Sequence, residues 1–179
     1  MRTHGATGLA FDTIVASGPN AALPHYHAGS RPVQEGEPIT IDWGAELDGY
    51  RSDLTRTIVL GQPDAKFREV YDIVLKSQLN AINNIKANIT GKEADAFSRD
   101  VIVAAGYGEQ FGHSLGHGVG LATHEGPRAS YLAEEERLPI GTVITLEPGI
   151  YIPGWGGVRI EDMIVVMEDG VEVLSHLPK

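Results

Sequence analysis

The chain has 179 residues, of which 42% are hydrophobic and 21% are charged, as is typical of a globular protein with one domain and a substantial core. It contains no cysteine, which excludes disulfides, thiolate zinc sites and cysteine nucleophiles and fits a reducing, cytoplasmic location. The formal net charge of −10, and the lack of any apolar run approaching about 20 residues, argue against nucleic acid or a membrane as a partner.

The first third of the chain alternates between strand and turn signals. Residues 9–16 are rich in β-branched and aromatic side chains and predict a strand, which is followed by a loop that contains His25. Residues 39–44 alternate with period two, so that Asp42 lies on the face opposite to the apolar side chains. A further strand is expected over residues 50–60, and it forms a hairpin with the strand before it.

The middle of the chain predicts two helices. Asp64 is a suitable N-cap for a long helix that runs to about Asn88. Thr90 and Glu93 have the spacing of a capping box, which opens a shorter helix ending near Gly106. The long helix carries one mostly apolar stripe, formed by Phe67, Val70, Tyr71, Val74, Gln78, Ala81, Ile82 and Ile85.

A run rich in glycine and histidine follows the helices. Residues 111–125 hold three of the chain's seven histidines, His113, His117 and His124, interleaved with four glycines. Histidine is the commonest metal ligand and the usual proton carrier near neutral pH, and glycine lets a backbone approach a ligand closely. We interpret the run as the floor of a site. The alternative is a glycine-rich turn with incidental surface histidines.

The last third returns to strand signals. Strands are predicted over residues 142–147, 158–166 and 171–174, with a turn at 153–157. The charged run at 134–137 is expected to be solvated and without function. Strands, then two helices, then strands indicate an α+β fold with a mainly antiparallel sheet.

The first hairpin brings two carboxylates together on one face. A turn centred just before Asp48 would place Asp42 directly opposite Asp53, whereas a turn on Asp48 and Gly49 would shift this pair by one step. Both registers remain open from the sequence. In either one, two negative charges lie close together on a strand pair, which destabilises a sheet unless something positive compensates them.

The second hairpin repeats this feature, because a turn centred on Gly154 places Glu147 opposite Glu161. Salt-bridged strand residues would explain either hairpin alone. Four carboxylates beside a histidine-rich run instead match two divalent ions held by shared oxygen ligands. The arginines that could otherwise compensate the charge are Arg51, Arg56 and Arg159.

Six segments together resemble a known family. They are ALPH (22–25), TIDWG (40–44), SDLTRT (52–57), HSLGHGVGLATHE (113–125), TLEPGIY (145–151) and GGVRIED (156–162). In this order they resemble the pita-bread-fold metallopeptidases over essentially the whole chain. They are most similar to the proline-specific branch, the Xaa-Pro dipeptidases (prolidases) and Xaa-Pro aminopeptidases. The resemblance implies a creatinase/aminopeptidase-like fold, with a curved, mainly antiparallel sheet covered by helices.

The resemblance implies five metal ligands. Asp42 would hold one ion, His117 and Glu147 would hold the other, and Asp53 and Glu161 would bridge the pair. In the family the ions are usually manganese or cobalt, with zinc or iron as possibilities, and the oxygen-rich ligand set favours manganese. A hydroxide bridging the two ions would attack the scissile carbonyl, and Glu147 would pass a proton to the leaving nitrogen.

Other site residues are also implied by the resemblance. His124 would stabilise the developing oxyanion or contact the scissile amide, and His25 and His113 would bind substrate on its proline side. Arg159 is expected to anchor the site electrostatically, and Arg128 either meets the substrate carboxylate or lies at the surface. The remaining histidines, expected at the surface without a role, are His4, His27 and His176.

The expected activity is metal-dependent hydrolysis of the Xaa-Pro bond in dipeptides or short peptides. The SDLTRT and GGVRIED segments favour this branch over the methionine aminopeptidases, which are the alternative within the fold. Two non-enzymatic alternatives remain, a pita-bread module that binds peptide or protein without hydrolysis and a metal-free structural domain. The presence of all five ligands argues against the binding module, and a metal-to-protein ratio near zero would favour the structural domain.

The resemblance also carries an expectation about the extent of the chain. Proline-specific members have an N-terminal domain and leading helices before the strand that begins near Leu9, and residues 1–5 resemble the end of such a helix. Residues 1–179 are therefore expected to be the catalytic domain, as a fragment of a longer protein that forms a homodimer. The sheet face that the helices would cover is expected to be exposed and apolar.

Overall fold

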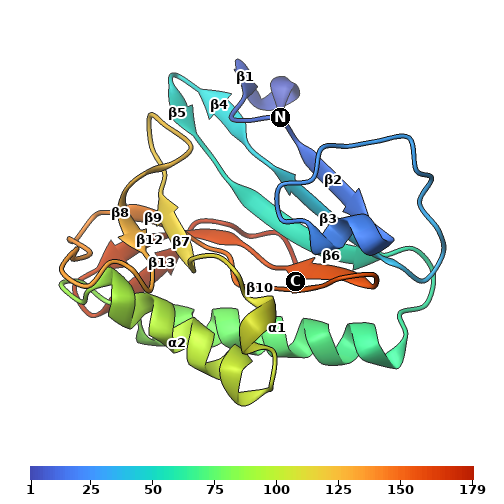
Figure 1. Ribbon diagram of the computed structural model, residues 1–179. Helices are drawn as coiled ribbons and strands as arrows, with labels where there is room; N and C mark the ends of the chain where they lie inside the picture. The colour runs from blue at the N-terminus through green and yellow to red at the C-terminus, as the bar shows by residue number, and fades with distance from the viewer.

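The computed structural model describes residues 1–179 and places two helices on one side of a set of antiparallel strands (Figure 1). The strands before the helices are β1 (Gly8–Leu9), β2 (Ile14–Ser17), β3 (Pro38–Trp43), β4 (Ala45–Leu47), β5 (Tyr50–Arg51) and β6 (Leu54–Val59). The helices are α1 (Ala65–Asn84) and α2 (Gly91–Ala104). The strands after them are β7 (Gly116–Gly118), β8 (Glu125–Ala129), β9 (Val143–Leu146), β10 (Gly149–Ile152), β11 (Gly156–Arg159), β12 (Asp162–Met167) and β13 (Gly170–Val173). The predicted α+β class is confirmed.

The strands form two principal sheets and two smaller ones. One sheet has the order β2-β3-β6, and the larger has the order β13-β12-β9-β7-β8. The strands β1, β4 and β5 form an outlying sheet at the top of Figure 1, and β10 pairs with β11 alone. Every pairing between these strands is antiparallel, as expected from the sequence.

Three of the predicted strands are each interrupted. Residues 9–16 contain the end of β1 and most of β2 with a gap between them, residues 50–60 split into β5 and β6, and residues 158–166 split between β11 and β12. One gap holds Asp53 and another holds Glu161. The gap at Glu161 arises from a change of hydrogen-bond partner, since the Glu161 amide donates to the Thr55 carbonyl of the other sheet at 3.1 Å.

The first hairpin has the later of the two predicted registers. Its turn lies at Asp48 and Gly49, which both have positive φ, at 52° and 83°. A two-residue hairpin turn of this kind requires positive φ at both positions, and Asp-Gly suits it well. As a result Asp42 pairs with Thr55, so the prediction of a directly opposed Asp42 and Asp53 is wrong, and the prediction with the one-step shift is confirmed.

The second hairpin has the predicted register. Gly149 pairs with Arg159 in the ladder of β10 and β11, and Leu146 pairs with Asp162 in the ladder of β9 and β12. The registers of both ladders correspond to a turn centred on Gly154. The pairing is interrupted between the two ladders, at residues 147–148 on one side and 160–161 on the other. The two strand pairs therefore act as one long hairpin with a gap in its middle.

Both helices begin where the sequence predicts. Asp64 caps α1 by accepting a bond from the Phe67 amide at 2.6 Å, and Thr90 and Glu93 form the reciprocal capping box of α2. However, α1 ends at Asn84, a turn before the predicted end near Asn88. The chain leaves the helix there because its following amides bond to other segments, as when the Asn88 amide donates to the Leu138 carbonyl.

The hydrophobic core lies between the helices and the strands above them. Ile150, Val158 and Ile160 pack against the buried face of α1, where Phe67 and Val70 lie. Since successive side chains of a strand point to opposite faces, the residues between these point away from the helices. The core therefore fixes the hairpin of β10 and β11 so that Arg159 and Glu161 face the opposite side, which is the side of the candidate site.

Two surface features complete the comparison with the sequence. The outer face of the β2-β3-β6 sheet carries exposed apolar side chains, with Val15 41% and Ile58 50% exposed, in line with the expectation of an exposed apolar sheet face.

The charged run at 134–137 forms ion pairs, although it was expected to be fully solvated. Glu134 pairs with Lys92 at 2.7 Å, and Glu136 lies 3.4 Å from Arg128. Neither helix is long and apolar enough to cross a membrane.

Candidate metal centre

An open cavity of about 490 Å³ lies on the side of the strands away from the helices. Its walls come from the segment before β2, the loop after β2, β3, the gap between β5 and β6, the glycine-rich run and the two glutamates of the second hairpin. All eight residues that the sequence predicts for the site line it: His25, Asp42, Asp53, His113, His117, His124, Glu147 and Glu161. Segments far apart in the sequence therefore converge on one cavity.

The predicted metal ligands form a compact group within this cavity. Ligand atoms of Asp53, His117 and Glu161 all lie within 4.8 Å of one another, as in a site that could hold a metal ion. The Nε2 atom of His117 lies 3.8 Å from Asp53 Oδ2 and 3.3 Å from Glu147 Oε1. Asp42 lines the same cavity and is held by Arg159, with 2.8 Å between its Oδ2 atom and the arginine Nη2.

Two glycines let the strand that carries His117 fit between its neighbours. A Cβ atom at Gly116 would overlap the Thr145 carbonyl of β9, and one at Gly118 would come within 2.5 Å of the Gly126 carbonyl of β8. Neither position can accept a side chain unless the neighbouring backbone moves. The glycines beside His117 are thus explained by packing, which places the imidazole at the floor of the cavity.

The imidazole of His117 has a fixed orientation. Its Nδ1 atom lies 3.0 Å from the Gly118 carbonyl oxygen, which can only accept, so Nδ1 carries a proton and donates it. The Nε2 atom then faces the carboxylates and is free to bind a metal ion whenever the ring is neutral. A histidine ligand whose other nitrogen donates to a backbone carbonyl is the usual arrangement at metal sites.

Arginine side chains compensate only one of the four carboxylates. Of the three candidate arginines, Arg159 alone contacts one of them, while Arg51 pairs with Glu46 and Arg56 pairs with Asp162. The Oδ1 atom of Asp42 is buried and has no hydrogen-bond partner. Unpaired buried carboxylate oxygens are costly, and divalent cations would satisfy them. The donor set therefore fits metal ions.

The ionisation of the carboxylates reflects this excess of negative charge. Burial, together with the charges of Asp42 and Glu147, raises the pKa of Asp53 to about 8. Burial, followed by the charges of Asp53, Glu147 and Asp42, raises the pKa of Glu161 well above its ordinary value. Without metal, the protein holds protons here that a bound cation would replace.

Glu147 behaves in the opposite way. Burial alone would raise its pKa, but the hydrogen bond from His117 and the positive charges nearby lower it to about 2. In turn, Glu147 raises the pKa of His117 against the effect of burial. Glu147 is therefore a carboxylate at neutral pH, available to accept a proton.

A directed chain of hydrogen bonds links Asp42 to His113. Arg159 donates from Nη2 to Asp42 and from Nη1 to the Tyr151 hydroxyl at 2.9 Å, so that the hydroxyl donates in turn to His113 Nε2 at 2.8 Å. The His113 Nδ1–H group donates to the Ser114 carbonyl at 2.8 Å. Burial lowers the pKa of His113 and raises that of Tyr151 to about 12, which keeps both groups neutral.

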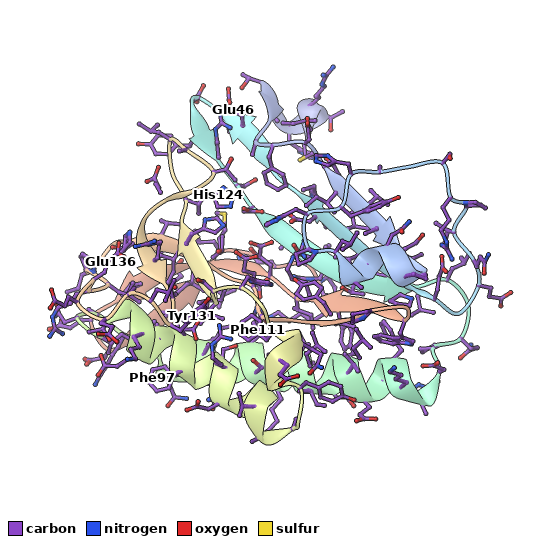
Figure 2. The ribbon with its side chains drawn as sticks, in the orientation of Figure 1. Glu46, Phe97, Phe111, His124, Tyr131 and Glu136 are labelled. Carbon is purple, nitrogen blue, oxygen red and sulfur yellow. The ribbon has the colours of Figure 1, made fainter.

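The other two predicted histidines lie nearer to solvent. The ring of His124 lies 4.0 Å from the ring of His117, measured between centroids, and Figure 2 shows His124 in the gap between the two sets of strands. Burial and the neighbouring His117 lower the pKa of His124. His25 is exposed on the loop after β2. Both line the cavity at positions that a substrate could reach.

Sequence reasoning missed some residues of the site. Tyr151 was not assigned a role, and it supports the site from behind the cavity lining through its hydrogen bonds to Arg159 and His113. Its even spacing of four residues from Glu147 is the signal that could have identified it. His27 was expected at the surface without a role, and it does lie exposed, but it also lines the cavity. Arg128 lines the cavity with a side chain that is 61% exposed and paired with Glu136.

Comparisons with known proteins point to a single family. Residues 1–168 match the family model described as metallopeptidase family M24. The Xaa-Pro dipeptidase of Pyrococcus horikoshii is 51% identical over 175 residues, which are 98% of this chain and 50% of that protein.

Solved structures give the same result. A structure described as an Xaa-Pro dipeptidase from Bacillus anthracis matches with a TM-score of 0.96 and 52% identity, covering 99% of this chain and 50% of that one. An X-Pro aminopeptidase from Thermotoga maritima matches with a TM-score of 0.95 and 48% identity, also over 99% and 50% of the two chains. The chain spans about half the length of the relatives it matches, and the predicted pita-bread fold is confirmed.

Proposed function

Because the chain belongs to metallopeptidase family M24, we propose that it hydrolyses the Xaa-Pro bond of dipeptides or short peptides with two divalent metal ions. When bound, the ions would supply an activated water and polarise the scissile carbonyl group. The observation that carries the proposal is the convergence of Asp53, His117 and Glu161 in a cavity whose carboxylates meet a single arginine. The dipeptidase relatives support the proline-specific branch.

Five residues of this chain would hold the ions. Asp42 would bind one ion, His117 and Glu147 the other, and Asp53 and Glu161 would be shared between the two. Four of these five side chains offer carboxylate oxygens, which suits manganese better than the softer metals. Cobalt, zinc and iron are the alternatives within the proposal.

The remaining steps belong to side chains of the chain itself. Glu147 is ionised at neutral pH, and as a carboxylate beside the scissile bond it would accept a proton and pass it to the leaving nitrogen. His124 would donate to the oxygen on which negative charge develops. His25 and His113 would contact substrate on its proline side. The cavity volume of about 490 Å³ lies in the range of small-molecule sites.

Hydrolysis of proline dipeptides and tripeptides tests the proposal. The chain is incubated with Mn²⁺ and either Ala-Pro or Ala-Pro-Ala, and the release of alanine is measured. Cleavage of Ala-Pro alone indicates a dipeptidase, and cleavage of Ala-Pro-Ala indicates an aminopeptidase. Peptide binding without cleavage, at full metal content, would favour a non-catalytic binding module instead. For the full-length protein we propose a homodimer, which light scattering measures directly.

A further inference from the structure

Helix α2 carries a buried ion pair outside the metal centre. Arg99 donates to both carboxylate oxygens of Asp95, from Nε to Oδ2 at 2.5 Å and from Nη2 to Oδ1 at 3.0 Å. The Asp95 side chain is 1% exposed and that of Arg99 is 20% exposed. Neither residue lines the cavity. A buried ion pair needs further hydrogen-bond partners to offset its loss of hydration, and the identity of these partners indicates the role of the pair.

The Asp95–Arg99 pair forms its remaining hydrogen bonds with the backbone around His113. Arg99 donates to the Phe111 carbonyl at 2.9 Å and to the His113 carbonyl at 2.7 Å. The Leu115 amide donates to Asp95 Oδ1 at 2.9 Å. The backbone is therefore held at three alternate residues, with His113 in the middle.

Two aromatic rings hold the guanidinium group itself. Its central carbon lies 4.2 Å from the centroid of the Phe111 ring and 4.7 Å from that of Tyr131. Figure 2 shows the labelled Phe111 and Tyr131 beside α2, on its strand side. The Phe111 ring also meets the His113 imidazole edge-on, at 5.1 Å between centroids. A planar guanidinium can stack between rings while it donates in its own plane, which a lysine ammonium cannot do.

We propose that Arg99 and Asp95 are positioning residues for His113. They fix the backbone on both sides of the histidine, and through Phe111 they support one side of its ring. With the backbone fixed, the imidazole donates to the Ser114 carbonyl and accepts from the Tyr151 hydroxyl, so one tautomer and one ring orientation face the cavity. The expected effect of Arg99 and Asp95 on turnover rests on the proposed function, whereas their expected effect on the His113 ring does not depend on it.

The ring nitrogens of His113 provide a direct test. Long-range ¹H–¹⁵N spectra are recorded on the chain with added Zn²⁺, which is diamagnetic, and His113 is assigned from its absence in His113→Gln. The wild type is expected to show the single tautomer protonated at Nδ1. Arg99→Lys keeps the charge, but the three donors of an ammonium group cannot replace the four hydrogen bonds of the planar guanidinium, so a mixture of tautomers is expected. The matched control is Arg68→Lys on the exposed face of α1, which should match the wild type.

A double-mutant comparison tests the consequence for activity. Arg99→Lys is expected to lower kcat/KM for a proline dipeptide by about 10- to 100-fold, as small misplacements of a contacting group do. In the His113→Gln background the same change should cause no further loss, because the positioned ring is absent. Full additivity of the two losses would overturn the proposal, as would an unchanged His113 spectrum in Arg99→Lys.

A milder variant covers the case in which Arg99→Lys does not fold. Tyr131→Leu removes one of the two rings that hold the guanidinium, at a side chain that is 43% exposed. It should shift the His113 spectrum in the same direction by a smaller amount, and an unchanged spectrum would count against the proposal. If the wild type cleaves no proline peptide, the proposed function fails, while the spectra still decide the role of Arg99.

Discussion

Glu147 lies opposite Glu161 at the point where two antiparallel ladders of one register are both interrupted. The interruption leaves the Glu161 amide free to bond to Thr55 of the other sheet, and the Thr55 hydroxyl donates to the Glu161 carboxylate at 2.6 Å. Opposed carboxylates would ordinarily destabilise a strand pair. The hairpin thus concentrates negative charge where the two sheets meet, and that charge governs the response of the protein to pH and to metal.

The first prediction concerns the metal-free chain, which should lose stability as the pH rises. An unfolded aspartate ionises near pH 4, whereas burial raises the pKa of Asp53 to about 8 in the folded state. Between these values the folded state binds the extra proton, so the free energy of unfolding falls with pH, by up to about 1.4 kcal/mol for each unit. Urea unfolding in the presence of a chelator, at pH 5 to 8, measures this slope.

Asp53→Asn isolates the contribution of this aspartate, because asparagine resembles the protonated form. The lowered pKa values of His113 and His124 act in the opposite direction, and they are present in both proteins. The variant should therefore match the wild type near pH 5 and exceed it in stability near pH 8. Equal slopes for the two proteins would show that Asp53 ionises normally.

The second prediction concerns the same variant with metal present. A saturating ion stabilises the folded state by about 2.7 kcal/mol when its concentration is one hundred times its dissociation constant. Mn²⁺ should raise the thermal midpoint of the wild type but should have little effect on Asp53→Asn, which lacks one of the proposed shared carboxylates. Proline dipeptide hydrolysis should disappear in the variant. Undiminished turnover together with a full Mn²⁺ shift would remove Asp53 from the ligand set.

The sequence predicted the faces of the strands better than their ends. Alternation alone places Asp42 on the face away from the apolar residues, and the register of the second hairpin follows from its turn at Gly154. The gap at Glu161 could not be predicted, because it depends on an amide that bonds to a strand more than 100 positions away. Local patterns contain no information about such partners.

The same limit applies to the charged residues. The charge pattern alone offered Arg51, Arg56 and Arg159 to compensate the carboxylates, and only the family resemblance singled out Arg159. Of the three, Arg159 is the one whose side chain contacts a carboxylate of the site. Which arginine reaches which carboxylate depends on how the two sheets meet. In contrast, both helix N-termini were predicted correctly, since a cap is a contact between residues three positions apart.

The third prediction tests the packing that positions His117. A methyl group at Gly116 would overlap the Thr145 carbonyl, so Gly116→Ala should push β7 away from β9. Overpacking of this kind costs about 1–3 kcal/mol. The matched control is Gly112→Ala in the same run, where a Cβ atom meets nothing within 4 Å and φ is not in the left-handed region.

Chemical denaturation and metal titration together decide this prediction. Gly116→Ala should unfold at lower urea concentration than Gly112→Ala and should bind Mn²⁺ more weakly, because its histidine is displaced. If the two variants are equally stable, the close approach of β7 and β9 does not account for the glycine. A loss of stability with unchanged Mn²⁺ affinity would separate the packing of the strand from the position of its imidazole.

The last prediction concerns Arg56, which contacts the backbone of Glu161 but none of the four carboxylates of the site. It is 4% exposed, pairs with the fully buried Asp162 at 2.8 Å, and donates to the Glu161 carbonyl at 2.6 Å. Removal of one partner of a buried pair usually costs about 3–5 kcal/mol. Arg56→Met should therefore be strongly destabilised in urea, although Lys179, at 2.6 Å from Asp162, retains part of the compensation.

Two comparisons separate the charge of Arg56 from its shape. Arg68→Met, on the exposed face of α1, removes the same charge and should change the free energy of unfolding by less than about 0.5 kcal/mol. Adding Asp162→Asn to Arg56→Met removes the uncompensated carboxylate and should recover part of the loss. Since Arg56 also holds the Glu161 backbone, Mn²⁺ affinity should stay reduced in the double variant. Complete recovery of both stability and Mn²⁺ binding would instead mean that Arg56 acts through its charge alone.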